Sequence, residues 1–277
     1  LGSGKIMQAK QLAPVSVIIP CLNCEDTIGR ALNSVSRQTW QPKEVILTAD
    51  DGSTDQTLSI LQELRSSLGS SWIKILDLGK NNGPSAARNA GWNVAAQPYL
   101  AFLDADDAWH PRKVEIQLKY MQDHPEIAIT GHRWSWLRKE EDPFPLQDPY
   151  TIKPVTKRMM LVSNRLPTST VMLKSDLDFR FEPAKSHSED YLIWLRIICS
   201  KYKASYIDLD LAYSYKAPYG SSGLSSQLWA MERGELDTYR RLCDEQLISR
   251  PTVVALGAFS LAKYMQRVAI SKLRMRR

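Results

Sequence analysis

Short apolar runs alternate with amphipathic segments through the first hundred residues of the chain. Runs of five residues, rich in β-branched or aromatic side chains, predict buried strands at residues 15–19, 44–48, 72–76 and 99–103. Between these runs, apolar residues recur every three or four positions, which predicts helices near residues 28–35, 61–68 and 83–90. Such repeats predict an α/β, Rossmann-like fold with a mostly parallel sheet, helices on both faces, and ligands at the carboxyl ends of the strands.

The pattern changes beyond Pro111. We predict a helix over residues 114–121, a strand near 127–130, a long loop over 140–154, a strand over 169–173, a helix that begins at Glu189, and helical structure from residue 225 onward. Asp26 is a candidate cap for the first helix. The predicted organisation is a tag or disordered lead (1–14), two halves of one domain (15–110 and 111–220) and a helical, basic extension (221–277).

Two polar clusters follow predicted strands. Asp50 and Asp51 come directly after the second strand, where a carboxylate can accept hydrogen bonds from a base or a ribose. Helix capping explains one of the nearby polar residues but not both aspartates. The second cluster, residues 81–89, is a turn through Gly83 into a helix whose first turn can direct amides at a diphosphate. Arg88 would add positive charge there, although it could also be an ordinary surface arginine.

The third cluster contains three carboxylates at the end of the fourth strand: Asp104, Asp106 and Asp107. Like charges this close repel one another unless a cation or hydrogen-bond donors compensate them. Oxygen ligands of this kind suit Mg²⁺ or Mn²⁺ bridging phosphate oxygens. Solvated loop acids are the simpler alternative, but they leave the position after a buried strand unexplained.

These motifs resemble the family 2 inverting glycosyltransferases, which have the GT-A fold and include bacterial enzymes of cell-surface polysaccharide and lipopolysaccharide synthesis. The matching segments are residues 15–20 (VSVIIP), 50–55 (DDGSTD), 82–89 (NGPSAARN) and 104–107 (DADD). The resemblance implies a donor nucleotide site made of Pro20, Asn23, Asp50, Asp51, Gly83, Arg88 and Asp104. It also implies Mn²⁺ or Mg²⁺ held by Asp106 and Asp104. By the same resemblance, residues 15–110 are the nucleotide-sugar-binding half of the domain and residues 111–220 are the acceptor-binding half.

Residues 188–196 (SEDYLIWLR) resemble the ED motif of the same family. The resemblance makes Asp190 the catalytic base and Glu189 a residue that orients it or the acceptor. An alcohol of high pKa needs such a base to attack the anomeric carbon. One in-line displacement then inverts that centre, while the metal and Arg88 neutralise the departing diphosphate. The family favours a UDP-sugar as the donor.

Other features refine this hypothesis. No QxxRW motif of processive synthases is present, which favours addition of one or a few sugars to a glycan or lipid-linked glycan. Trp109 and His187 are candidate acceptor contacts. A Mg²⁺-dependent phosphohydrolase and a non-catalytic nucleotide- or sugar-binding module are the alternatives. The segment Cys21 to Cys24 forms a CxxC, but a lone CxxC is a weak redox signal.

The end of the chain is basic. The whole sequence carries 36 basic and 30 acidic residues, yet seven bases and no acid follow Glu245. Three apolar residues share one face of the predicted helix: Leu261, Met265 and Val268. Three bases lie on the opposite face: Lys263, Arg267 and Arg274. This pattern favours contact with an anionic membrane over nucleic acid, although the apolar face could instead pack on the domain. No segment has the roughly 20 apolar residues of a spanning helix. We therefore expect a cytoplasmic protein with peripheral contact to the inner face of the cytoplasmic membrane.

Overall fold

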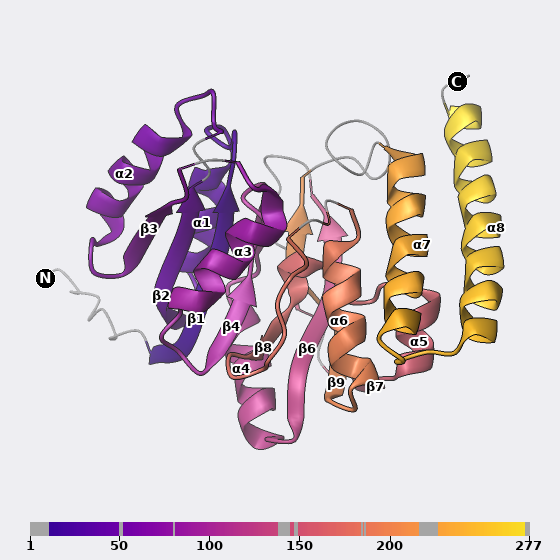
Figure 1. Ribbon diagram of the computed structural model, residues 1–277. Coiled ribbons are helices and arrows are strands. Elements are labelled where there is room, and N and C mark those ends of the chain that lie inside the picture. The colour runs from indigo at the N-terminus through magenta and orange to yellow at the C-terminus, as the bar shows by residue number, and fades with distance from the viewer. Residues whose placement is uncertain are drawn as a thin grey trace, which may run out of the picture.

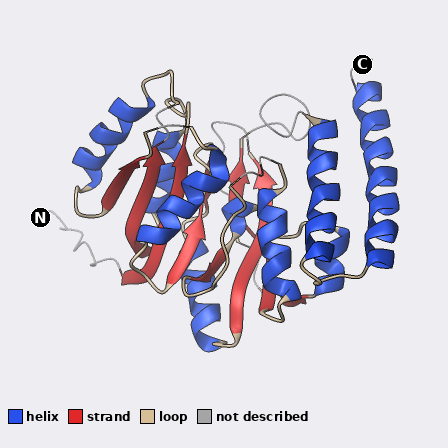
Figure 2. Ribbon diagram, in the orientation of Figure 1, coloured by secondary structure: helices blue, strands red, loops and turns tan. Residues whose placement is uncertain are grey.

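The computed structural model describes residues 11–49, 52–79, 81–137, 145–146, 149–183, 185, 187–215 and 227–274, with side chains up to residue 268. One sheet runs through the molecule in the order β3-β2-β1-β4-β8-β6-β9-β5, and β7 pairs with β9. Figure 2 shows helices packed against this sheet, with the last two helices at one end of it.

The first half of the sheet is parallel. It contains β1 (Gln11–Cys21), β2 (Trp40–Ala49), β3 (Ile73–Asp77) and β4 (Tyr99–Phe102), linked by α1 (Ile28–Ser36), α2 (Thr57–Leu68) and α3 (Gly83–Val94). The apolar residues that predicted α1 are all buried, because they face the sheet. The helix has Thr27 as its N-cap and no capping side chain, so the prediction that Asp26 caps it is wrong.

The second half of the sheet is mixed. Antiparallel β8 (Met172–Lys174) joins β4 to β6 (Ile127–Trp136), and β6 is parallel to β9 (Lys203–Ser214). The short strands β5 (Asp107–Trp109) and β7 (Ile152–Val155) pair antiparallel with β9. The α/β class is confirmed, but the sheet is less parallel than predicted, because the pattern of apolar runs gives no direction for strands that lack a helical crossover.

Helices cover both faces of the sheet. The side chains of β1 alternate, so Ile18 packs with α3 and with α6 (Glu189–Cys199), while Val17 and Ile19 pack with α1 and α4 (Lys113–Asp123). Beyond the sheet lie α5 (Lys157–Val162), α7 (Leu228–Asp244) and α8 (Arg250–Arg274), and α8 packs along α7 at the edge of the molecule (Figure 1). A one-turn 3₁₀ helix, η1 (Thr168–Thr170), precedes β8.

Several predicted boundaries change. Gln11 to Ala13 pair with β2, so the ordered fold begins before residue 15. The predicted loop over 140–154 contains the start of β7, although residues 140–144 and 147–148 lie outside the described residues. Sequence periodicity also missed β5, β9 and α5, and the helical tail is interrupted by a turn between α7 and α8. No helix in the described part of the chain is long and apolar enough to cross a bilayer.

Candidate active site

The loops after β1 and β2 hold each other in place. Asn23 adopts a left-handed backbone conformation with φ 47°. Its side-chain Oδ1 accepts a hydrogen bond from the backbone N–H of Thr54 at 2.8 Å, and its own N–H donates to Ser53 Oγ at 3.2 Å. Pro20 lies in the last part of β1, opposite Thr48. These residues therefore border the carboxyl ends of the parallel strands, as expected for a nucleotide site. Asp50 and Asp51 lie outside the described residues, so their roles stay predictions.

The turn into α3 requires glycine. Gly83 has φ +82°, a conformation that other residues rarely adopt, and its N–H donates to Asn81 Oδ1 at 2.9 Å. Gly52 lies so close to the same turn that an added Cβ would be 2.8 Å from Asn81 Cβ. The loop after β2 therefore lies against the turn at the amino-terminal end of α3, which is where the predicted diphosphate would bind.

Arg88 joins the two halves of the site. From α3 its Nη2 donates to Asp104 Oδ1 at 2.8 Å, and its Nη1 donates to Glu189 Oε1 at 2.9 Å. The guanidinium is almost completely buried, and Nε has no hydrogen-bond partner within the described residues. The two carboxylates outweigh desolvation and raise the pKa of Arg88, so it stays cationic. The interpretation of Arg88 as an ordinary surface arginine is wrong.

Ser169 connects the acidic cluster to η1. Its Oγ accepts a hydrogen bond from the backbone N–H of Asp104 at 3.1 Å and donates to Asp107 Oδ2 at 2.6 Å. Burial, together with the charges of Asp104 and Asp106, raises the pKa of Asp107 to about 8. The cluster is therefore a region of concentrated negative charge that a cation would stabilise.

The described carboxylates supply part of a metal shell. Among the described residues, which leave out Asp50 and Asp51, no group of three or more His, Cys, Asp and Glu side chains is arranged to hold a metal ion. Asp104 already binds Arg88 through one oxygen. Mg²⁺ commonly takes one or two protein carboxylates and completes its shell with water and phosphate oxygens. Asp104 and Asp106 fit that kind of site.

Asp190 occupies the first turn of α6 and is held by neighbouring polar groups. Its Oδ2 accepts hydrogen bonds from Asn164 Nδ2 at 3.1 Å and from Thr168 Oγ1 at 3.3 Å, and its Oδ1 accepts from the N–H of Tyr191 at 2.6 Å. Burial and the charge of the adjacent Glu189 together raise the pKa of Asp190 to about 6, against the opposing charge of Arg88 and the hydrogen bonds that the carboxylate accepts. A carboxylate with this pKa is ionised at neutral pH and is more basic than an exposed aspartate.

The loop before α6 is clamped by α7. Lys185 is buried and donates from Nζ to the Gly234 carbonyl at 2.7 Å and to Asp237 Oδ2 at 3.1 Å. Ser188 adopts φ 56°, and the backbone carbonyl of His187 lies so near Gly234 that an added Cβ would be 2.7 Å away. The position of the ED motif therefore depends on a helix that lies about fifty residues later in the chain.

Trp109 does not lie where a sugar could stack on it. Only 2% of its surface is exposed, its Nε1 donates to the Ser169 carbonyl at 2.7 Å, and Lys113 Nζ lies 3.7 Å from its ring centroid. This burial contradicts the prediction that Trp109 contacts the acceptor. Trp109 is the last residue of β5, and its side chain packs in the core. Trp134, on β6, is 43% exposed and lines a small cavity of about 140 Å³ beside Asp104.

Sequence reasoning missed several residues of the site. They are Asn164, Thr168, Ser169 and Trp134. Three of them come from the segment between α5 and β8, which has no strong hydrophobic period. The dense polar segment 167–170 (PTST) in front of an apolar run was the available signal.

An α/β fold with an arginine and paired carboxylates at the carboxyl ends of its parallel strands is typical of enzymes that bind nucleotides. The model of Glycosyl transferase family 2 matches residues 16–178, more than half of the chain. The chain belongs to this family, and it is a glycosyltransferase.

Named relatives and solved structures agree with this class. The chain is 31% identical, over 75% of its length and 78% of the relative's, to the Escherichia coli UDP-Glc:alpha-D-GlcNAc-diphosphoundecaprenol beta-1,3-glucosyltransferase WfaP. It is 29% identical over 69% of its length to the similarly named E. coli enzyme WfgD, 77% of which is covered. The fold is similar to that of S. aureus TarS 1-349 in complex with UDP-GlcNAc, with a TM-score of 0.65 at 22% identity over 91% of this chain and 72% of that one. This likeness confirms the predicted GT-A architecture.

Proposed function

We propose that this enzyme transfers a sugar, with inversion, from a UDP-sugar to a hydroxyl of a lipid-linked glycan in surface polysaccharide synthesis. The main supporting observation is the bridge from Arg88 to Asp104 and Glu189, because it places the donor cluster beside the ED motif. The named acceptor of WfaP and WfgD is a GlcNAc diphosphoundecaprenol, which supports an acceptor of the same chemical class here. Membership of a glycosyltransferase family removes the grounds for the phosphohydrolase and the binding-module alternatives.

In this proposal Asp190 takes the proton from the acceptor hydroxyl. The hydrogen bonds from Asn164 and Thr168 to Oδ2 fix the carboxylate, so that its remaining lone pairs point away from these donors. Glu189 is bound by Arg88 and acts as a positioning residue for the base. A direct displacement needs no covalent intermediate, which is why the proposal assigns inversion.

The donor diphosphate lies between Arg88 and the acidic cluster. Arg88 neutralises negative charge on the leaving group, and its Nε has no protein partner within the described residues. Asp104 and Asp106 would hold Mn²⁺ or Mg²⁺, which would neutralise the developing charge on the diphosphate. A Mn²⁺ complex is known for the structurally similar mannosyltransferase PcManGT from Pyrobaculum calidifontis, which matches with a TM-score of 0.63 at 15% identity over 97% of this chain and 79% of that one.

The donor site is tested by the thermal midpoint of unfolding with UDP, GDP, ADP, dTDP and CMP, each with and without Mn²⁺. A ligand at a hundred times its Kd stabilises the folded state by about 2.7 kcal/mol. We expect a shift with UDP that requires Mn²⁺ and disappears in Asp106→Ala. The matched control is Asp123→Ala, which removes an exposed carboxylate at the end of α4 and should leave the shift intact. A UDP-dependent shift of the same size without Mn²⁺ and in Asp106→Ala would overturn the metal assignment.

A further inference from the structure

The outward face of α8 is apolar along the described part of the helix. Between residues 251 and 268, every exposed side chain is non-polar except Gln266. The exposed positions are Pro251, Val254, Ala255, Ala258, Phe259, Leu261, Ala262, Met265 and Gln266. Val254 is 73% exposed and Met265 is 65% exposed. A helix on the surface of a water-soluble domain normally shows the reverse pattern, with its polar face outward.

The polar side chains of α8 instead face the domain. Lys263 Nζ donates to Glu235 Oε1 at 2.9 Å and to the Val162 carbonyl at 3.0 Å. Arg267 Nη2 lies 3.0 Å from Oε2 of the buried Glu232. These two bases are therefore occupied by α7 and α5, and they are not available to an external anion. The sequence analysis placed Leu261 and Met265 opposite Lys263 and Arg267, as the structure does, but left open which face packs on the domain; the side chain of Arg274 lies outside the described residues.

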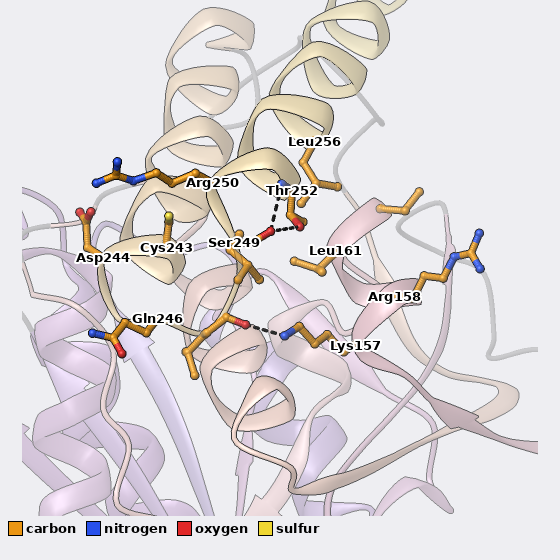
Figure 3. A pocket seen from close by; sticks show the side chains of 13 residues that line it. Lys157, Arg158, Leu161, Cys243, Asp244, Gln246, Ser249, Arg250, Thr252 and Leu256 are labelled. Atoms are coloured by element: carbon orange, nitrogen blue, oxygen red, sulfur yellow. Dashed lines mark hydrogen bonds between the residues drawn. The ribbon is translucent and has the colours of Figure 1, made fainter.

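A basic cavity lies beside the amino-terminal end of this apolar face. It has a volume of about 1090 Å³ and lies between α5, the turn after α7, and the start of α8 (Figure 3). Its lining includes the bases Lys157, Arg158 and Arg250 and one acid, Asp244. Lys157 Nζ already donates to the Leu247 carbonyl, so the bases left for an anion are Arg158 and Arg250, which extend from opposite sides of the cavity in Figure 3. Leu161 and Leu256 supply apolar surface in the same cavity. Cationic and apolar groups together match a phosphate attached to a hydrocarbon chain.

We propose that the outward face of α8 lies on an anionic lipid bilayer, with lipid headgroup phosphate in the cavity formed by α5 and α8. This inference rests on the lipid-linked acceptor of the proposed function, and it names the surface by which the enzyme would lie on the membrane that carries that acceptor. Charge complementarity favours lipid over a second copy of the chain, because the exposed bases Arg158 and Arg250 lie at the amino-terminal end of the apolar face and the sequence has no acid after Glu245. Two copies paired through this face would bring like charges together, whereas anionic lipid would neutralise them.

The test is flotation of the full chain with vesicles of phosphatidylcholine, alone or with a quarter of phosphatidylglycerol. We expect the wild type to float with the vesicles that contain phosphatidylglycerol. In the sample with phosphatidylcholine alone, it should remain in the soluble fraction. The double variant Leu261→Glu, Met265→Glu should lose at least tenfold in vesicle partitioning. Leu58→Glu changes an equally exposed leucine on α2 and should bind like the wild type. Arg158→Glu should weaken binding to the anionic vesicles, because it replaces a base at the cavity with an acid.

Two further measurements distinguish the possible failures. The UDP-dependent thermal shift of the double variant should equal that of the wild type, because α8 contributes nothing to the donor site. Vesicle binding that fails while this shift remains would overturn the docking surface and leave the proposed transfer reaction intact. The proposal is also overturned if the wild type does not bind vesicles, is a dimer by light scattering, and the double variant is a monomer. That result would show that a second copy of the chain covers α8.

Discussion

The ionised carboxylate of Asp190 should lower the free energy of unfolding at neutral pH, because burial removes this charge from water. Its pKa is raised from an ordinary 3.8 to about 6, chiefly by burial. The folded state therefore holds the proton more tightly than the unfolded state does, and the destabilisation grows as the pH rises from about 3.8 to about 6 and is constant above that. At about 1.36 kcal/mol for each pH unit, the buried charge costs about 3 kcal/mol at pH 8.

The substitution Asp190→Asn removes this charge at nearly constant size. An asparagine keeps an oxygen for Asn164 and Thr168 but loses the hydrogen bond from the N–H of Tyr191, which is worth about 1 kcal/mol. The net gain at pH 8 should be about 2 kcal/mol, seen as a rise of about 5 °C in the melting temperature. Near pH 3.5 the charge contribution is largely gone, since the wild-type carboxyl is then mostly protonated in both states, and the lost hydrogen bond should leave the variant less stable than the wild type by about 1 kcal/mol.

The assay is calorimetric or fluorescence-monitored unfolding of both proteins from pH 3.5 to 8, combined with transfer of sugar to a GlcNAc-diphosphate lipid. Transfer by the variant should fall by about a hundredfold or more, as for loss of a general base, while the UDP-dependent shift remains. Wild-type kcat should decline as the pH falls through about 6. A stability difference that is the same at every pH would refute the pKa argument, and unimpaired turnover would refute the assignment of the base.

Other substitutions test the rest of the site. Arg88→Lys should destabilise the fold by about 3 kcal/mol in unfolding experiments, because a single ammonium nitrogen lacks the planar fork whose two nitrogens bind Asp104 and Glu189 separately; an unchanged midpoint would contradict the bridge. Gly234→Ala places a Cβ 2.7 Å from a backbone carbonyl of the loop before α6 and should lower kcat while UDP binding remains. Gly257→Ala, whose Cβ would meet only ordinary contacts on the neighbouring helix, is its control and should be neutral or stabilising by up to about 1 kcal/mol. Trp134→Ala should raise KM for the acceptor more than Trp136→Ala does in initial-rate assays, since only the former lines the cavity beside the acidic cluster; equal effects would remove this role.

The sequence by itself determined the parallel half of the fold. The runs at 15–19, 44–48, 72–76 and 99–103 all became strands. In β1, β2 and β4 the apolar run reflects burial on both faces, whereas β3 is the edge strand and is buried only in part. The same order of elements placed Gly83, Arg88 and Asp104 at one edge of the sheet, because parallel strands joined by helices end on the same side. Local pattern was sufficient there because each unit is short and folds back on its neighbour.

Tertiary structure decided how the two halves of the chain meet. The bridge from Arg88 to Glu189 joins residues about a hundred positions apart, and no local pattern reports such a pairing. The core position of Trp109 and the exposed position of Trp134 depend on how β5 and β6 enter the sheet, which the alternation of side chains alone does not fix. The same is true of α8: its two faces follow from helical period, but the acids of α7 decide that its bases face inward and its apolar residues outward.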